Sequence, residues 1–134
     1  MTPRGIRNFN PGNIRLGQQW QGLAPKQTDP VFCQFASPEY GIRAIAKIMQ
    51  TYRDVYHLHT VQGIIGRWAP PNENDTPAYV QSVAHQMGVA PADRIDTNVQ
   101  SVMCSLVKAI IQHENGQQPY SDQQIEQGVQ MAES

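Results

Sequence analysis

The chain has 134 residues, of which 40% are hydrophobic, and its formal net charge at pH 7 is −1. This size is typical of one domain with its own core, and the balanced charge excludes a general electrostatic attraction to nucleic acid or to an anionic membrane. No apolar run approaches the roughly 18 residues of a membrane span, and the opening residues Met1–Gly5 include no apolar segment typical of a signal peptide. We therefore expect a single domain, residues 1–134, without a signal peptide and without a membrane or nucleic-acid partner.

Residues 4–36 carry most of the turn-forming residues and little helical periodicity. In Asn10-Pro11-Gly12-Asn13, Asn and Gly tolerate positive φ and Pro11 fixes its own φ, which predicts a turn. Extended segments are expected nearby, around residues 14–15, 19–23 and 31–35, and they can pair as a small antiparallel sheet or hairpin. The predicted fold class is therefore mainly α, of the α+β type, with a small N-terminal β region.

Apolar residues at helical spacing predict that residues 37–134 are helical. The five expected helices cover residues 37–56, 60–68, 76–88, 97–114 and 121–129. Residues typical of helix starts precede them, such as Ser37-Pro38, Thr76-Pro77 and Ser121 with Gln124. The helix at 97–114 has the widest apolar face, which predicts a central position in the domain.

Cysteine and histidine give weak signals of metal or thiol chemistry. Cys33 and Cys104 have apolar neighbours, which favours buried free thiols, although a disulfide between them stays open. His57 and His59 face opposite directions on a helix end and lack a third ligand nearby. We expect no metal site and no cofactor.

Glu114 is the strongest candidate for chemistry. It continues the apolar face of Val107, Ile110 and Ile111, so its side chain points toward the core side. It also lies at the negative end of the helix dipole, where a carboxylate does not stabilise the helix, and such an unfavourable local choice often marks function. A carboxyl group partly withdrawn from water in such a place can have its pKa raised enough to act as a general acid. The alternative is a solvated charge at a helix end.

Two segments resemble known enzymes. The sequence Ile110-Ile111-Gln112-His113-Glu114-Asn115-Gly116, followed by Tyr120, resembles the catalytic segment of lysozyme-fold glycosidases and lytic transglycosylases, where a helix ends in the acidic Glu. The N-terminal pattern resembles the hairpin region of bacterial glucosaminidases, which share that fold; it comprises Asn8–Arg15, Trp20-Gln21-Gly22, Thr28-Asp29 and Phe32 to Phe35. The stretch Glu73–Tyr79 is similar to their later segment.

The order of these segments differs from those families, in which the Glu helix precedes the hairpin. The resemblance therefore implies a circularly permuted lysozyme-like core, with helix 97–114 beside the N-terminal hairpin and a cleft between Glu114 and residues 13–35. The pattern from Arg4 to Thr76 also resembles small phage and prophage proteins that are often described only as structural or virion proteins.

The resemblance implies roles for several further residues. Many glycosidases use a second carboxylate; Asp29 is the first candidate and Glu39 the weaker one, although a turn residue and a first-turn helix charge are simpler roles for them. Lytic transglycosylases of this fold work with a single Glu. The candidates for substrate binding are Asn13, Arg15, Gln34, Tyr79 and Tyr120, through amide hydrogen bonds, stem-peptide carboxylates and stacking on sugar rings.

We therefore expect an enzyme that cleaves the glycan strands of peptidoglycan, of the lysozyme or lytic transglycosylase type, with Glu114 as general acid. It is expected to act on the cell wall after release, after injection or as part of a virion. The alternative is a non-catalytic component of a virion or a secretion apparatus that binds cell wall. A purely structural protein is a third hypothesis and predicts no affinity for the wall.

Overall fold

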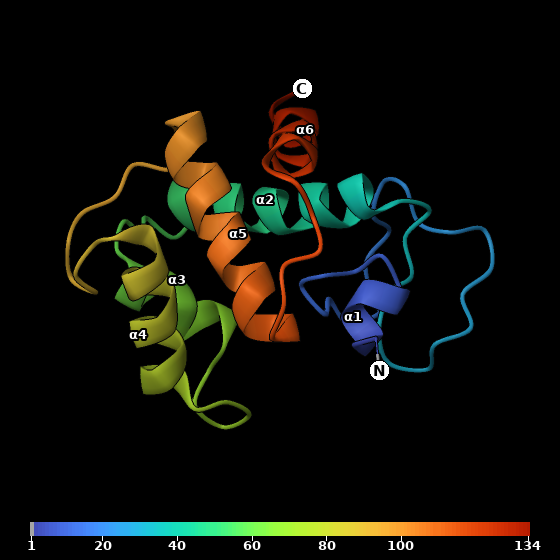
Figure 1. Cartoon of the computed structure of the whole chain (residues 1–134), viewed down its shortest axis with the longest axis horizontal. Helices are drawn as coiled ribbons and strands as arrows, with labels where there is room; N and C mark the ends of the chain where they lie inside the picture. Colours follow the sequence, from blue (N-terminus) through green and yellow to red (C-terminus); the bar gives the residue numbers. More distant parts are fainter. Residues whose placement is uncertain (1) are drawn as a thin grey trace.

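The computed structural model describes residues 2–134, and its regular secondary structure is helical (Figure 1). The helices within these residues are α1 (Arg4–Arg7), α2 (Pro38–Asp54), α3 (Val61–Trp68), α4 (Thr76–Met87), α5 (Gln100–Asn115) and α6 (Asp122–Glu133). Residues 2–134 form no strand or sheet, only isolated bridges that pair Arg15 with Phe32, Leu23 with Phe35, and Thr60 with Arg94. The expectation of an α+β fold with an N-terminal β-hairpin is therefore wrong, and the fold is all-helical.

Side-chain hydrogen bonds take the place of a strand ladder in the N-terminal region. The buried Asn10 donates through Nδ2 to the carbonyl oxygens of Ile14 and Cys33, each at 2.9 Å, and accepts from the Ile14 N–H at 3.0 Å. Gly17 and Gly22 have φ values of 135° and 82°, which interrupt the extended runs around them. A ladder needs consecutive paired residues, and this region provides only single bridges.

The five helices predicted after residue 36 are all confirmed, with small shifts at their ends. Ser121 and Gln124 form the predicted capping box of α6. Gly88 and Gly116 follow α4 and α5 in the left-handed conformation, with φ values of 73° and 69°. The start of α5 differs from the prediction, because the Asp96 side chain accepts from the Asn98 N–H and thereby orders the turn before the helix.

Helices α2 and α5 provide most of the fully buried core, as expected from the wide apolar face of α5. Their largest buried side chains are Ile42, Ile45, Met49, Met103, Leu106, Ile110 and Ile111. Figure 1 shows α5 crossing α2, with α3 and α4 on one side and the N-terminal loops on the other; α6 packs against α2. This arrangement brings the end of α5, and with it Glu114, next to the N-terminal region.

Cys33 and Cys104 are free thiols, as the favoured prediction has it, but only Cys33 is buried and Cys104 is partly exposed. Burial raises the pKa of both thiols. Within residues 2–134, no helix has both the length and the apolar character needed to cross a membrane.

Candidate functional site

Glu114 lies in the last turn of α5, half-buried, with both carboxylate oxygens hydrogen-bonded. Asn13 Nδ2 donates to Oε1 at 3.0 Å, and the Tyr79 hydroxyl donates to Oε2 at 2.6 Å. Both donors are neutral, and no cation within residues 2–134 forms an ion pair with this carboxylate. Glu114 is therefore oriented from two sides, by the N-terminal loop and by α4, without a fixed positive partner.

Tyr79 is itself held by two aromatic neighbours. The indole Nε1–H of Trp68 donates to the Tyr79 hydroxyl at 2.9 Å, and the rings of Tyr79 and His113 stack with centroids 3.8 Å apart. Burial, together with the charge and the hydrogen bond of Glu114, raises the pKa of Tyr79 far above its ordinary value of 10.0. The hydroxyl therefore stays protonated and acts as a donor to Glu114.

Asn13 lies where the N-terminal loop packs against the end of α5. Its backbone is left-handed, with φ of 51°, a conformation that Asn tolerates better than most residues. Nearby, Asn115 Nδ2 donates to the Pro11 carbonyl at 2.8 Å. Gly5 packs so closely here that a Cβ would lie 2.7 Å from Asn13 Oδ1 and 2.8 Å from Asn115 Oδ1. This tight contact fixes the direction from which Asn13 reaches Glu114.

A cleft of about 450 Å³ opens beside Glu114. The side chains and backbone that line it come from the N-terminal loop, α2, α3 and the α3–α4 loop, and include Asn13, Arg15, Phe32, Tyr52, Trp68 and Glu73. Arg15 Nη2 lies 3.6 Å from Glu73 Oε1. A second hollow of about 300 Å³ is lined by Asp75, Tyr79 and His113, and also by Glu114. Glu114 thus borders two hollows rather than bulk solvent alone.

Three residues singled out in the sequence meet at this place: Asn13 and Arg15 line the cleft with Glu114, and Tyr79 binds its carboxylate. Their roles differ in part from those expected. Tyr79 is 2% exposed, so it contacts Glu114 rather than presenting a ring face to the cleft. Asn13 uses its amide donor on Glu114.

Asp29 lies outside the cleft and organises the N-terminal loop. Its carboxylate accepts two hydrogen bonds from the Arg4 guanidinium, one at 2.7 Å, and others from Asn8 Nδ2 at 3.0 Å and from the backbone N–H groups of Val31 and Phe32. The bond with Arg4 is the largest cause that holds the pKa of Asp29 far below its usual range. With its acceptor positions engaged in this way, Asp29 acts here as a structural ion.

Glu39, Gln34 and Tyr120 also lie away from Glu114, since none of them lines either hollow. Gln34 Oε1 accepts from the backbone N–H groups of Thr28 and Asp29, at 2.6 and 3.2 Å, and so closes the loop. Burial and the charge of Glu39 raise the pKa of Tyr120 to about 12.

The carboxylate that the structure brings into the cleft is Glu73, which the sequence analysis did not single out as a catalytic candidate. Its side chain is 54% exposed in the α3–α4 loop. The sequence distinguishes the segment Glu73–Tyr79 only by its resemblance to a later segment of glucosaminidases. A loop residue has no periodicity that would place it on a face, so nothing in the sequence directed Glu73 toward Glu114.

Comparison with known proteins relates the chain to a phage protein. No family model matches the chain. Over 131 residues, which cover 95% of this chain and 80% of the relative, the sequence is 39% identical to Protein P5 of Pseudoalteromonas phage PM2. The name of this relative states no activity, but its source agrees with the phage character expected from the sequence. Because the similarity extends over nearly the whole chain, the protein belongs to the family of Protein P5 of phage PM2.

Proposed function

We propose that this protein cleaves the glycan strands of peptidoglycan, with Glu114 as general acid. The observation that carries the proposal is the setting of Glu114: a half-buried carboxylate at the edge of a cleft, oriented by the neutral donors Asn13 and Tyr79. A carboxyl oxygen can take part in more than one hydrogen bond. Each oxygen therefore keeps a position for the proton that the reaction transfers.

In the proposed reaction, protonated Glu114 donates its proton to the glycosidic oxygen while the bond to the anomeric carbon breaks. The electron pair of that bond stays with the leaving oxygen, and an oxocarbenium-like sugar forms. Water then attacks the anomeric carbon and returns a proton to Glu114 in a hydrolase; in a lytic transglycosylase the sugar's own hydroxyl attacks and returns it. Both routes restore the acid for the next cycle.

Glu73 is the second carboxylate of this proposal, in place of Asp29 and Glu39. It lines the same cleft as Glu114, and its negative charge favours the positive charge that develops on the sugar ring. Its exposure and its pairing with Arg15 weaken this effect relative to a buried carboxylate. We therefore assign Glu73 a smaller contribution than Glu114.

A distant, permuted relation to lysozyme-like enzymes forms part of the proposal. It is supported by a helix-terminal Glu that lines a cleft together with the N-terminal segment and binds Asn13 of that segment, although the segment is a loop and not a hairpin. The phage source of the relative agrees with a phage protein. The proposed site of action is the bacterial wall, reached as part of a virion, by injection or after release.

The direct test is the clearing of purified peptidoglycan sacculi by the wild type, Glu114→Gln and Glu126→Gln. Glu126 is an exposed carboxylate on α6 that does not line the cleft, so it controls for loss of a negative charge. We expect Glu114→Gln to clear at least about 100-fold more slowly, since general acid catalysis contributes roughly 10²- to 10⁴-fold, and Glu126→Gln to match the wild type. Equal clearing by Glu114→Gln and the wild type overturns the mechanism.

The soluble products identify the reaction. Mass spectrometry of released fragments finds anhydro ends for a transglycosylase and reducing ends for a hydrolase. A wild-type protein that binds sacculi but releases no fragments is instead a wall-binding phage component, and one that does not bind is a structural protein.

A further inference from the structure

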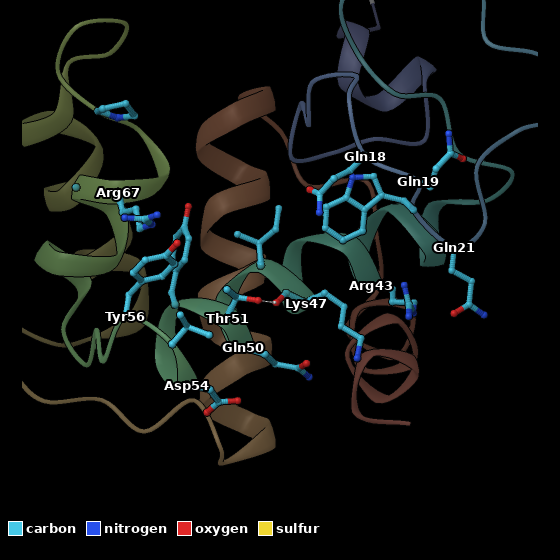
Figure 2. Close-up of a pocket in the computed structure, with 16 residues that line it drawn as sticks. Gln18, Gln19, Gln21, Arg43, Lys47, Gln50, Thr51, Asp54, Tyr56 and Arg67 are labelled. Atoms are coloured by element: carbon cyan, nitrogen blue, oxygen red, sulfur yellow. Dashed lines mark hydrogen bonds between the residues drawn. The ribbon is translucent and has the colours of Figure 1, made fainter.

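A groove of about 1150 Å³ lies along α2. Figure 2 shows α2 beneath it, with Tyr56 and Arg67 on one side and Gln18 and Gln19 on the other. Ile48 and Tyr52 line both this groove and the cleft of Glu114, so the two hollows adjoin. A chain-like ligand that lies in one of them can therefore continue into the other.

The groove carries an excess of positive charge. Arg43 and Lys47 of α2 and Arg67 of α3 line it, and none of them forms an ion pair with another residue in the described part of the chain. Asp54 also lines the groove, but Arg53 binds its carboxylate at 2.7 Å and offsets its charge. This excess is local, because the whole chain has a net charge of −1.

Two of these cations, Arg43 and Lys47, are placed unfavourably for their helix. Arg43 and Lys47 are four residues apart, a spacing at which like charges destabilise a helix. Arg67 is held over the ring of Tyr56, with its guanidinium carbon 3.5 Å from the ring centroid. Its planar guanidinium is suited to binding a carboxylate through two hydrogen bonds. The like-charge pair Arg43 and Lys47, which forms no ion pair within residues 2–134, is a local cost of the kind found at binding surfaces.

The rest of the lining includes amide and aromatic side chains beside aliphatic ones. Gln18, Gln19, Gln21 and Gln50 provide amide donors and acceptors, and Trp20 and Tyr52 provide ring surface. Amide groups and aromatic rings match the N-acetyl groups and ring faces of a sugar chain, while three separate cations match discrete carboxylates. A nucleic acid carries a continuous row of phosphates, to which three cations among so many amides are a poorer match.

We propose that this groove binds the part of a peptidoglycan strand that carries stem peptides, with Arg43, Lys47 and Arg67 binding the stem-peptide carboxylates. The identity of the ligand rests on the proposed function of the adjoining cleft. In this arrangement the groove holds the strand along α2 and directs a neighbouring glycosidic bond toward Glu114.

The test measures binding in a Glu114→Gln background, so that cleavage does not affect the result. Retention is compared on intact purified sacculi and on sacculi from which an amidase has removed the stem peptides. The variants are the double variant Arg43→Gln/Lys47→Gln and the single variant Arg67→Gln. The matched control for the double variant replaces Lys26 and Lys108, which are exposed and do not line the groove, by Gln.

On intact sacculi we expect the double variant to bind about tenfold more weakly, Arg67→Gln to bind more weakly as well, and the lysine control to bind as the parent protein. On stripped sacculi all four proteins should bind alike, at the weaker level. Added salt should weaken the parent's binding to intact sacculi and leave its binding to stripped sacculi unchanged, a readout that needs none of the groove variants to fold.

Equal binding of the parent protein to intact and stripped sacculi, without salt dependence, overturns the assignment. Tighter binding to a single-stranded oligonucleotide than to sacculi also overturns it, in favour of a nucleic-acid site. If the wild type clears no sacculi but stem-dependent binding is lost in the groove variants, the cleavage proposal fails while the groove assignment stands. If clearing depends on Glu114 and the groove variants bind normally, only the groove assignment fails.

Discussion

The hydroxyl of Tyr79 donates a hydrogen bond of 2.6 Å to Glu114 Oε2. The same hydroxyl accepts from the indole N–H of Trp68 at 2.9 Å. This chain of hydrogen bonds joins α3, α4 and the end of α5, so the orientation of the proposed acid depends on Trp68 as well as on Tyr79. The hydroxyl of Tyr79 is thus a positioning group whose removal should affect both stability and rate.

Replacing Tyr79 with Phe keeps the buried ring and removes this hydroxyl. Trp68 and Glu114 each lose a partner, which should lower the free energy of unfolding by about 1–3 kcal/mol in urea titrations. The clearing rate should fall about tenfold, because the acid loses one of its two orienting donors, while retention on sacculi stays the same.

Tyr120→Phe is the matched control, because Tyr120 is also buried but its hydroxyl has no partner within residues 2–134. It should leave stability unchanged or slightly higher and leave clearing unchanged. Equal effects of the two substitutions would contradict the positioning role of Tyr79.

Two substitutions of Asn13 can separate the effect of its backbone conformation from the effect of its hydrogen-bond donor. Its φ of 51° suits Gly and disfavours Ala, while both substitutions remove the donor to Glu114 Oε1. Asn13→Gly should therefore be more stable than Asn13→Ala, by roughly 1–2 kcal/mol, although both should clear sacculi about equally slowly. Thermal unfolding and clearing assays on the two variants test this, and a rate that follows stability instead of the lost donor argues against an orienting role for Asn13.

The helices from α2 to α6 are predictable from the sequence because their signals are local. Apolar spacing, the Ser121–Gln124 capping box and the terminal Gly88 and Gly116 act within a few residues of the helix that they define. Glu114 is identifiable for the same reason, as the continuation of an apolar face up to a helix end.

The N-terminal region is not predictable in this way, because distant side chains determine its conformation. Asn10 reaches Cys33, and Arg4 binds Asp29, across more than twenty residues in each case. Residue types typical of extended strands gave the expectation of a hairpin, but these side-chain bonds satisfy the backbone without a ladder. Glu73 reaches the cleft only through the path of the α3–α4 loop, which no local pattern specifies.

Asp29 should make the stability of the protein vary with pH in the acid range. Its pKa is lowered in the folded state relative to its ordinary value of 3.8, mainly by the hydrogen bond with Arg4. A carboxylate with a lowered folded-state pKa stabilises the fold fully above its unfolded pKa, and this stabilisation is lost as the pH falls below it. Asp29→Asn should therefore unfold at a lower temperature than the wild type near neutral pH, and the difference should shrink below about pH 4. Thermal unfolding across this range measures the difference, and one that stays constant into strong acid contradicts the prediction.

Gly128 tests how closely α6 must pack on α2, and Gly66 of α3 provides the comparison. A Cβ on Gly128 would lie 2.5 Å from Ile42 Cγ2 and 3.0 Å from the backbone oxygen of Glu39, whereas a Cβ on Gly66 in α3 would meet nothing within 4 Å. Gly128→Ala should lose about 1–3 kcal/mol through overpacking, and Gly66→Ala should gain roughly 0.5–1 kcal/mol from helix propensity, both measured in urea. A Gly128→Ala variant as stable as the wild type would mean that α6 shifts freely.

The same substitution should separate stability from the proposed chemistry. Because α6 does not line the cleft of Glu114, Gly128→Ala should still clear sacculi at the wild-type rate well below its unfolding temperature.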